Sequence, residues 1–171
     1  MKMPVFTPAA KRELKGLAAR LAAFGAGTWL LLGVVFGVGS VQNGDMHPTM
    51  EAGDVYFYYR LQTKWHAGDL VCAQKEGKVL VGRVAAQAGD SVEITPAGEV
   101  LVNGGRVVEN DIHTDTPAYE GGPEYPVQLG EGELFLLCDE RLGGADSRLY
   151  GPVSAEECRG KILVLVRRNN L

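Results

Sequence analysis

The sequence predicts a mainly β domain of antiparallel strands, built as a partly closed barrel or sandwich and preceded by one transmembrane helix. An uncharged run from Leu21 to Gly44 comes first, and short apolar runs separated by Gly, Asp, Asn and Pro follow it. The chain has 171 residues, of which 46% are hydrophobic, so it is long enough for one ordinary domain with a small appendage. We therefore expect a single hydrophobic core.

The N-terminal segment combines positive charge with a long apolar run. Its basic residues, opposed there only by Glu13, are Lys2, Lys11, Arg12, Lys15 and Arg20. The uncharged run exceeds the roughly 20 residues that a helix needs to cross a bilayer, and the positive flank favours a cytoplasmic N-terminus. We predict a cytoplasmic basic segment at 1–20, a transmembrane helix at 21–41 and an extracytoplasmic β domain at 42–171.

Two alternatives to a membrane anchor compete for the same run. One is a cleaved secretory signal with Gly37-Val38-Gly39-Ser40 as its cleavage site, although such signals have apolar regions of only about 7–15 residues. The other is a buried core helix, which the all-round apolar surface and the cationic flank disfavour in so small a protein. The anchor is favoured, giving a single-pass protein of the cell membrane.

The pattern of residues 42–171 predicts a series of short strands. The expected strands are 55–59, 70–73, 79–81, 91–94, 100–102, 106–108, 134–137 and 162–166. Asn103-Gly104 supplies the residues that tolerate positive φ in a tight hairpin. The polar stretch 110–130 is rich in Pro and Gly and predicts a long surface loop.

Charge and cysteine content exclude some functions. A formal net charge of -4 offers no broad basic surface, so nucleic acid is not expected as a partner. Cys72, Cys138 and Cys158 are an odd number, so at most one internal disulfide can form and the pairing is open. The histidines His47 and His113, like His66, follow no zinc-ligand spacing, and we expect neither a metal nor a cofactor.

Three ordered segments resemble the conserved boxes of the type I signal peptidase family. Residues 43–50, Asn-Gly-Asp-Met-His-Pro-Thr-Met, are similar to the box Ser-x-Ser-Met-x-Pro-Thr, whose second serine is the nucleophile. Gly82-Arg83-Val84 resembles a Lys-Arg-Val box, whose lysine is the general base. Residues 138–148 are similar to Gly-Asp-Asn-Arg-x-x-Ser-x-Asp-Ser-Arg. Their order after an N-terminal anchor makes the resemblance specific.

The resemblance assigns family roles to positions that carry other residues here. Asp45 stands at the nucleophile position and Gly82 at the base position. Asn43 replaces the hydroxyl donor of the oxyanion hole, and Gly144 replaces the serine that supports the base. The family's cleft and scaffold residues are kept at Met46, Pro48, Thr49, Arg83, Asp139, Arg141, Asp146, Ser147 and Arg148. We therefore expect no intact Ser/Lys dyad.

These replacements change the chemistry that the site can support. A Ser/Lys dyad needs an uncharged lysine amine to take the proton of the serine hydroxyl. A carboxylate at position 45 attacks an amide poorly and repels the developing oxyanion. Lys78 cannot substitute, because four residues of strand separate it from position 82 by about 13 Å. An aspartic-protease pair of Asp45 with Asp146 would have to share a proton, and Arg148 is expected to keep Asp146 ionised.

These considerations predict a binding role for the former site. We expect Asp45 to form a salt bridge with Arg83 or Arg148. Degenerate family members with aspartate and glycine at the dyad resemble the accessory proteins of Gram-positive pilus assembly, which implies a chaperone-like function. The chain would then be an inactive signal peptidase I homologue that binds exported polypeptides, a pilin or a secretory precursor, by strand addition. The alternatives are an active type I signal peptidase, a serine endopeptidase with a rearranged site, and a purely structural membrane β domain.

Overall fold

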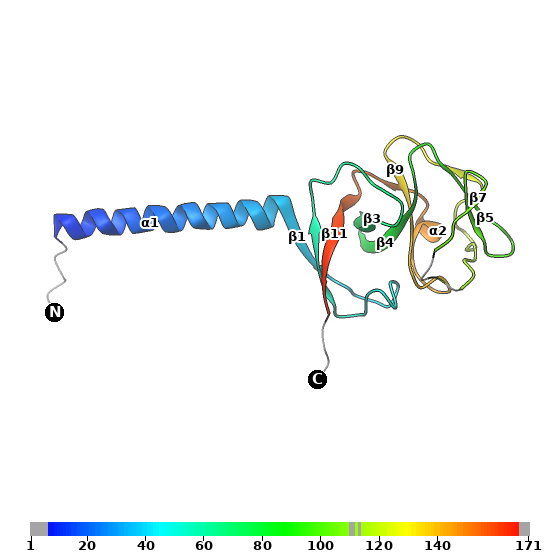
Figure 1. The fold of residues 1–171 in the computed structure, drawn as a ribbon, viewed down its shortest axis with the longest axis horizontal. Coiled ribbons are helices and arrows are strands. Elements are labelled where there is room, and N and C mark those ends of the chain that lie inside the picture. The colour runs from blue at the N-terminus through cyan, green and yellow to red at the C-terminus, as the bar shows by residue number, and fades with distance from the viewer. Residues whose placement is uncertain (1–6, 110–111, 113, 168–171) are drawn as a thin grey trace. The chain divides into compact units, whose positions relative to one another are not determined.

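The computed structural model describes residues 7–109, 112 and 114–167 (Figure 1). The predictions for Lys2 and His113 lie outside these residues, as do positions 110 and 111 of the expected loop at 110–130. The chain divides into two compact units, one ending at Phe36 and the other beginning at Gly37.

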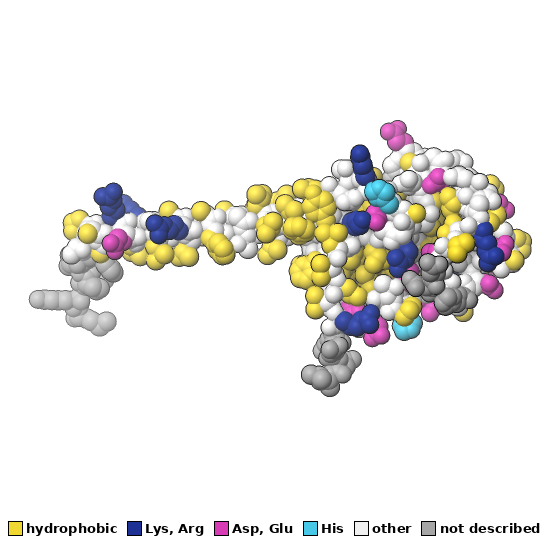
Figure 2. Space-filling view, viewed as in Figure 1, with side chains coloured by type: hydrophobic (Ala, Val, Ile, Leu, Met, Phe, Trp, Pro, Cys, Tyr) yellow, Lys and Arg dark blue, Asp and Glu magenta, His cyan; other side chains and the backbone are white. Residues whose placement is uncertain are grey.

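The first unit is a long apolar helix. The α-helix α1 (Pro8–Trp29) continues as the π-helix η1 (Leu30–Val35). Thr7 caps α1 by accepting a 3.3 Å hydrogen bond from the Ala10 amide, and Pro8 follows it at the first helical turn, where a missing N–H costs nothing. Pro8–Val35 is long and apolar enough to cross a membrane, and none of its residues is buried. Figure 2 shows Lys and Arg gathered towards its start and apolar side chains beyond them. These features suggest membrane anchoring.

The expected helix at 21–41 differs from the structure at both ends. Helical structure begins at Pro8 and ends at Val35, and the last residues of the predicted segment form the strand β1 (Phe36–Ser40). The cause lies in two glycines of this strand. The rings of Tyr58 and Tyr56 occupy the places where side chains at Gly37 and Gly39 would start. The absence of side chains therefore lets β1 lie against these aromatic rings.

The second unit contains two antiparallel sheets. The larger has the order β1-β2-β11-β3-β4-β9-β10. Its further strands are β2 (Val55–Tyr59), β3 (Leu70–Lys75), β4 (Lys78–Gln87), β9 (Glu133–Leu137), β10 (Val153–Ser154) and β11 (Cys158–Val166). The smaller sheet has the order β7-β6-β5-β8, with β5 (Ser91–Ile94), β6 (Val100–Val102), β7 (Gly105–Arg106) and β8 (Val127–Gln128). The predicted fold class, mainly antiparallel β with one N-terminal apolar helix, is confirmed.

Individual strands depart from the sequence prediction in length and number. The strand expected at 79–81 extends over 78–87, and the one expected at 106–108 is reduced to Gly105–Arg106. Asn103 has the positive φ expected of the hairpin residue, 53°, and Gly104 follows with 76°. β8 and β10, each two residues long, have no apolar run of their own. Only their pairing with β5 and β9 makes them strands.

Buried side chains from several strands fix the position of the segment that follows β1. Met46 and Met50 are 1% and 0% exposed and belong to a core cluster with Tyr56, Tyr58 and Cys138. Two methionines four residues apart thus hold residues 43–50 against the larger sheet.

Candidate functional site

Residues 43–50 form a compact turn anchored by the two buried methionines. His47 donates a 2.9 Å backbone hydrogen bond to Gly44, and Met50 donates one of 2.8 Å to Met46. The peptide bond between His47 and Pro48 is cis. Between these bonds the turn holds Asp45 half-buried.

The Asp45 side chain is held by an amide. Asn43 donates a 2.8 Å hydrogen bond from Nδ2 to Oδ2 of Asp45, and the Asp45 amide donates back to Asn43 Oδ1 at 3.3 Å. The backbone of Asp45 accepts a 2.9 Å hydrogen bond from the Glu140 amide. The position assigned to the nucleophile therefore lies beside the third box, with a carboxylate where a hydroxyl would be needed.

The expected salt bridge of Asp45 with Arg83 or Arg148 is wrong. Arg83 lies 2.8 Å from Asp139, and Arg148 lies 2.8 Å from Asp146. Across residues 7–109, 112 and 114–167, Asp45 makes no ion pair. The third box supplies each arginine with a better-buried carboxylate, because the side chains of Asp139 and Asp146 are 1% and 0% exposed.

A hydrogen-bonded cluster joins one residue from each box. Arg83 donates to Asp139 through Nε at 3.1 Å and Nη2 at 2.8 Å, a two-point contact that fixes both groups. Thr49 donates a 2.5 Å hydrogen bond to the same carboxylate. The structure thus brings together three of the scaffold residues that the sequence predicts.

A second cluster surrounds the fully buried Arg148. Asp146 accepts from the Arg148 guanidinium and also from the Cys138 amide at 2.8 Å. Arg148 donates at 2.5 Å to the Arg141 carbonyl and lies 4.4 Å from the centre of the Tyr119 ring. Burial acts to lower the pKa of Arg148, but the hydrogen bonds and charge of Asp146 outweigh it and raise the pKa. The guanidinium therefore stays charged inside the protein.

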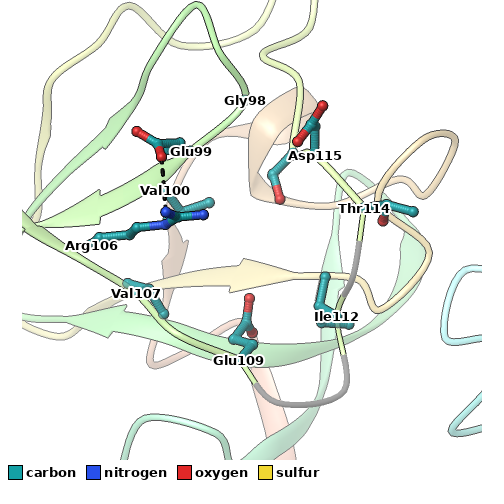
Figure 3. Close-up of a pocket in the computed structure, with 10 residues that line it drawn as sticks. Gly98, Glu99, Val100, Arg106, Val107, Glu109, Ile112, Thr114 and Asp115 are labelled. Atoms are coloured by element: carbon teal, nitrogen blue, oxygen red, sulfur yellow. Dashed lines mark ion pairs between the residues drawn. The ribbon is translucent and has the colours of Figure 1, made fainter.

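Sequence reasoning missed the partners of Arg141. This fully buried arginine donates to Glu109 at 2.6 and 2.8 Å and to Thr116 at 3.1 Å. Glu109 directly precedes the polar stretch 110–130 and Thr116 lies within it, where no sequence pattern marks a buried ion pair. Both also line a pocket of about 250 Å³ beside the Arg106–Glu99 ion pair, which Figure 3 shows. The pocket contains none of the positions assigned to the dyad.

The base position offers no amine. A Cβ at Gly82 would lie 3.1 Å from Leu136 Cβ, so any residue with a side chain at this position would require Leu136 to shift slightly. Lysine amines elsewhere have other partners. Lys75 bonds Pro152 and Glu157, Lys78 bonds Tyr150 and Lys161 pairs with Asp69. In the part of the chain that the structure describes, no lysine donates to a serine or threonine hydroxyl.

Cys138 is a further residue of the site that sequence reasoning did not single out. It is fully buried, and all three cysteines of the chain are free thiols, so the structure contains no disulfide. Burial raises the pKa of the Cys138 thiol, and the negative charges of Asp146 and Asp45 raise it further. Its position in the third box, where the family pattern has glycine, was the available signal. Among the described residues, no group of His, Cys, Asp and Glu is suited to a metal ion.

Comparison with known proteins identifies the family. A family model described as signal peptidase, peptidase S26, matches residues 15–166. The chain belongs to this family. A probable signal peptidase I-2 of Synechocystis sp. is 28% identical over 163 residues, covering 80% of this chain and 72% of that protein.

Two further proteins extend the comparison. Thylakoidal processing peptidase 1 of Arabidopsis thaliana is 27% identical over 141 residues, which are 71% of this chain but only 39% of that protein. A crystal structure of a signal peptidase I from Enterococcus faecalis covers 60% of this chain and 98% of its own, at 20% identity and a TM-score of 0.48.

In this signal peptidase I-like protein the three box segments contact one another. The turn at 43–50 touches the third box through Asp45 and Glu140, and Thr49, Arg83 and Asp139 share one cluster. The carboxylate of Asp45 stands at the nucleophile position, Gly82 stands at the base position, and the third box contains the buried thiol of Cys138.

Proposed function

We propose that this signal peptidase I-like protein binds exported polypeptides without cleaving them, as a catalytically inactive homologue. The observation that supports this most is the environment of Asp45. Its carboxylate is held by the Asn43 amide, and no lysine amine is hydrogen-bonded to a serine or threonine hydroxyl among the described residues.

The chemistry of the site argues against acyl transfer. Acyl transfer by a Ser/Lys dyad requires a serine hydroxyl and a base that takes its proton. Asp45 supplies a negative charge at the place where an oxyanion would form, which disfavours the tetrahedral state. Asp146 cannot complete an aspartic pair with Asp45, because Arg148 and the Cys138 amide occupy its two oxygens.

Binding can proceed without any of these catalytic groups. β1 is an edge strand of the larger sheet and leads directly into the turn at 43–50. An edge strand presents unpaired backbone groups, to which an extended polypeptide can add as a further strand. The polypeptide would then pass the half-buried Asp45 without meeting a nucleophile.

The site of action is the outer face of the cytoplasmic membrane. Helix α1 with η1 anchors the protein, and the basic residues near its start favour a cytoplasmic N-terminus. Aspartate and glycine at the two dyad positions resemble the accessory proteins of pilus assembly, so we infer that the bound polypeptide is a pilin handled by a chaperone-like mechanism.

Site-directed photocrosslinking tests this proposal. A photoreactive residue replaces Asp45 in the membrane-bound protein, and a matched variant carries it at the exposed Glu131, in the turn before β9. We expect position 45 to capture a polypeptide that bears an export signal, identified by mass spectrometry, and position 131 to capture far less. Equal capture at both positions, or none at position 45, contradicts the proposal.

A further inference from the structure

An apolar groove lies beside the third box, next to the turn that joins β5 to β6. Its volume is about 590 Å³, within the range of pockets that bind ligands in proteins. Leu142 lines it and is 65% exposed, although Arg141 directly before it is fully buried. A single exposed leucine is ordinary, but one that adjoins a continuous apolar surface marks a binding site. The other apolar residues of the groove are Ile94, Pro96, Ala97, Pro117 and Ala118.

Buried arginines hold one wall of the groove in place. Arg141 donates a 3.1 Å hydrogen bond to the Thr116 hydroxyl, and Arg148 donates one of 3.3 Å to the Pro117 carbonyl oxygen. The Thr116 amide also donates at 2.8 Å to the Gly98 carbonyl oxygen, which joins this wall to the turn between β5 and β6. Both arginine side chains are 0% exposed. The groove is therefore formed before a ligand arrives, which lowers the entropic cost of binding.

The groove adjoins the residue that the proposed function places beside the polypeptide. The Glu140 amide donates a 2.9 Å hydrogen bond to the Asp45 carbonyl oxygen, and the Leu142 amide donates one of 3.1 Å to Oε1 of Glu140. Leu142 follows Glu140 by two residues, and consecutive Cα atoms lie about 3.8 Å apart. An extended polypeptide advances about 3.3 Å per residue, so roughly two or three of its residues cover this distance.

Carboxylates along this path favour a partner of positive charge. Asp115 is the charged residue that lines the groove, and Asp45 and Glu140 lie on the way to it. Among all residues that the structure describes, no cation forms an ion pair with any of these three. Complementary charge on a bound polypeptide is therefore positive.

We infer that the groove at Leu142 binds an apolar side chain of the exported polypeptide, in a segment where lysine or arginine flanks that side chain. This inference rests on the proposed function, because the same polypeptide passes Asp45. It adds a second contact that selects the polypeptide by its sequence.

Photocrosslinking from the groove tests the inference in the membrane-bound protein. A photoreactive residue replaces the exposed Ala118, and the exposed Glu131 again gives the control position. We expect position 118 to capture the same exported polypeptide as position 45. Mass spectrometry should place the crosslink in a segment that carries an apolar residue next to lysine or arginine. Capture by position 131 should be far weaker.

A second change shows whether Leu142 contributes to binding. Leu142→Ser should lower the yield at position 118 about tenfold, because a leucine side chain no longer leaves water on binding. The matched control is Leu61→Ser, which changes a leucine that is 52% exposed and does not line the groove. Its yield should equal that of the parent. Both leucines are exposed, so neither change removes a core side chain.

The pattern of capture separates this inference from the proposed function. Capture at position 45 without capture at position 118 overturns the inference and leaves the proposed function standing. An undiminished yield in Leu142→Ser overturns the inference in the same way. Capture at position 118 alone, lowered by Leu142→Ser, supports the groove and contradicts the proposed role of the site at Asp45. Absence of capture at both positions overturns both.

Discussion

Buried charges at single residues hold the third box in place. Asp146 and Arg148 have no exposed side-chain surface, yet each has several hydrogen-bond partners. A buried ion pair gives little net stability compared with apolar packing, but removing one partner leaves an uncompensated charge in the interior. The single carboxylate of Asp146 also accepts the Arg148 amide and thereby caps α2 (Ser147–Tyr150).

Asp146→Ala should lower the free energy of unfolding by about 3–5 kcal/mol, because it leaves Arg148 charged and buried. Urea unfolding of the detergent-solubilised chain measures the change. The control is Glu99→Ala, which removes the partner of Arg106 in a pair whose side chains are 40% and 68% exposed. That loss should stay within about 0–1 kcal/mol. Similar losses for both variants would contradict this account of the cluster.

The three cysteines should react slowly with thiol reagents in the folded protein. Burial raises the pKa of Cys72 and Cys138 and raises that of Cys158 to about 12, so little thiolate is present at neutral pH. Intact-mass measurement after alkylation should find almost no label on the folded chain. Three labels should appear after unfolding without a reducing agent. Fewer than three under those conditions would reveal a disulfide and contradict the free thiols.

At the scale of residues, the contacts between side chains could not be predicted from the box motifs. Thr49, Arg83 and Asp139, which the resemblance assigns to the scaffold, lie in one hydrogen-bonded cluster. The partner proposed for Asp45 was wrong, because sequence gives no measure of which carboxylates are nearest to an arginine in space. Glu109 was missed for the same reason, since it lies 32 positions from Arg141.

At the scale of elements, connections between strands depend on local ion pairs. Glu157 directly precedes β11. Its carboxylate accepts a 2.8 Å hydrogen bond from the Ser154 amide of β10 and forms a 3.2 Å salt bridge with Lys75 of β3. The Ser154 amide lowers the pKa of this carboxylate and Lys75 acts in the same direction, while slight burial opposes them. Three strands of the larger sheet thus meet at one ionised group.

The contribution of Glu157 should depend on pH. Because the pKa is lower in the folded state, its stabilisation is fully present above the ordinary value of 4.5 and is lost as the pH falls through the folded pKa. The Tm difference between the natural chain and Glu157→Gln should therefore be largest at neutral pH and shrink in acid. The exposed Glu131→Gln, which removes the same charge, serves as control. A difference that does not change with pH would contradict the assignment.

The sequence predicted strands that carry their own apolar run, although it gave only 79–81 of the longest strand, β4, and it missed the two-residue strands β8 and β10. Apolar runs such as 55–59 and 162–166 predict β2 and most of β11, because a buried strand must contain hydrophobic residues of its own. β8 and β10 carry no such run and are strands only through their neighbours. The predicted end of the apolar helix was wrong because the apolar, glycine-containing residues 36–40 are compatible with both a helix and a strand. The strand is favoured by the close packing of Gly37 and Gly39 against the tyrosine rings of β2, which the sequence does not reveal.

At the scale of the whole molecule, the proposed function requires the β domain to lie outside the cell membrane. The basic residues near the start of α1 favour a cytoplasmic N-terminus by the positive-inside tendency. The site at 43–50 can then meet polypeptides only after their export.

Protease protection tests this orientation. The chain is tagged at both ends, and protease is added to cells whose membrane is intact. We expect loss of the C-terminal tag and protection of the N-terminal tag, because α1 with η1 is long and apolar enough to cross the membrane once and the basic residues near its start favour a cytoplasmic N-terminus. Both tags should disappear when detergent opens the membrane. Protection of the C-terminal tag in intact cells would contradict the predicted topology.

The most direct test of the central claim is cleavage itself. The detergent-solubilised chain is incubated with a secretory precursor, and the products are separated by mass. Because Asp45 offers no hydroxyl and Gly82 offers no amine at the base position, we predict that the precursor stays intact at every time point. Cleavage by the natural chain that disappears in Asp45→Ala would contradict the account.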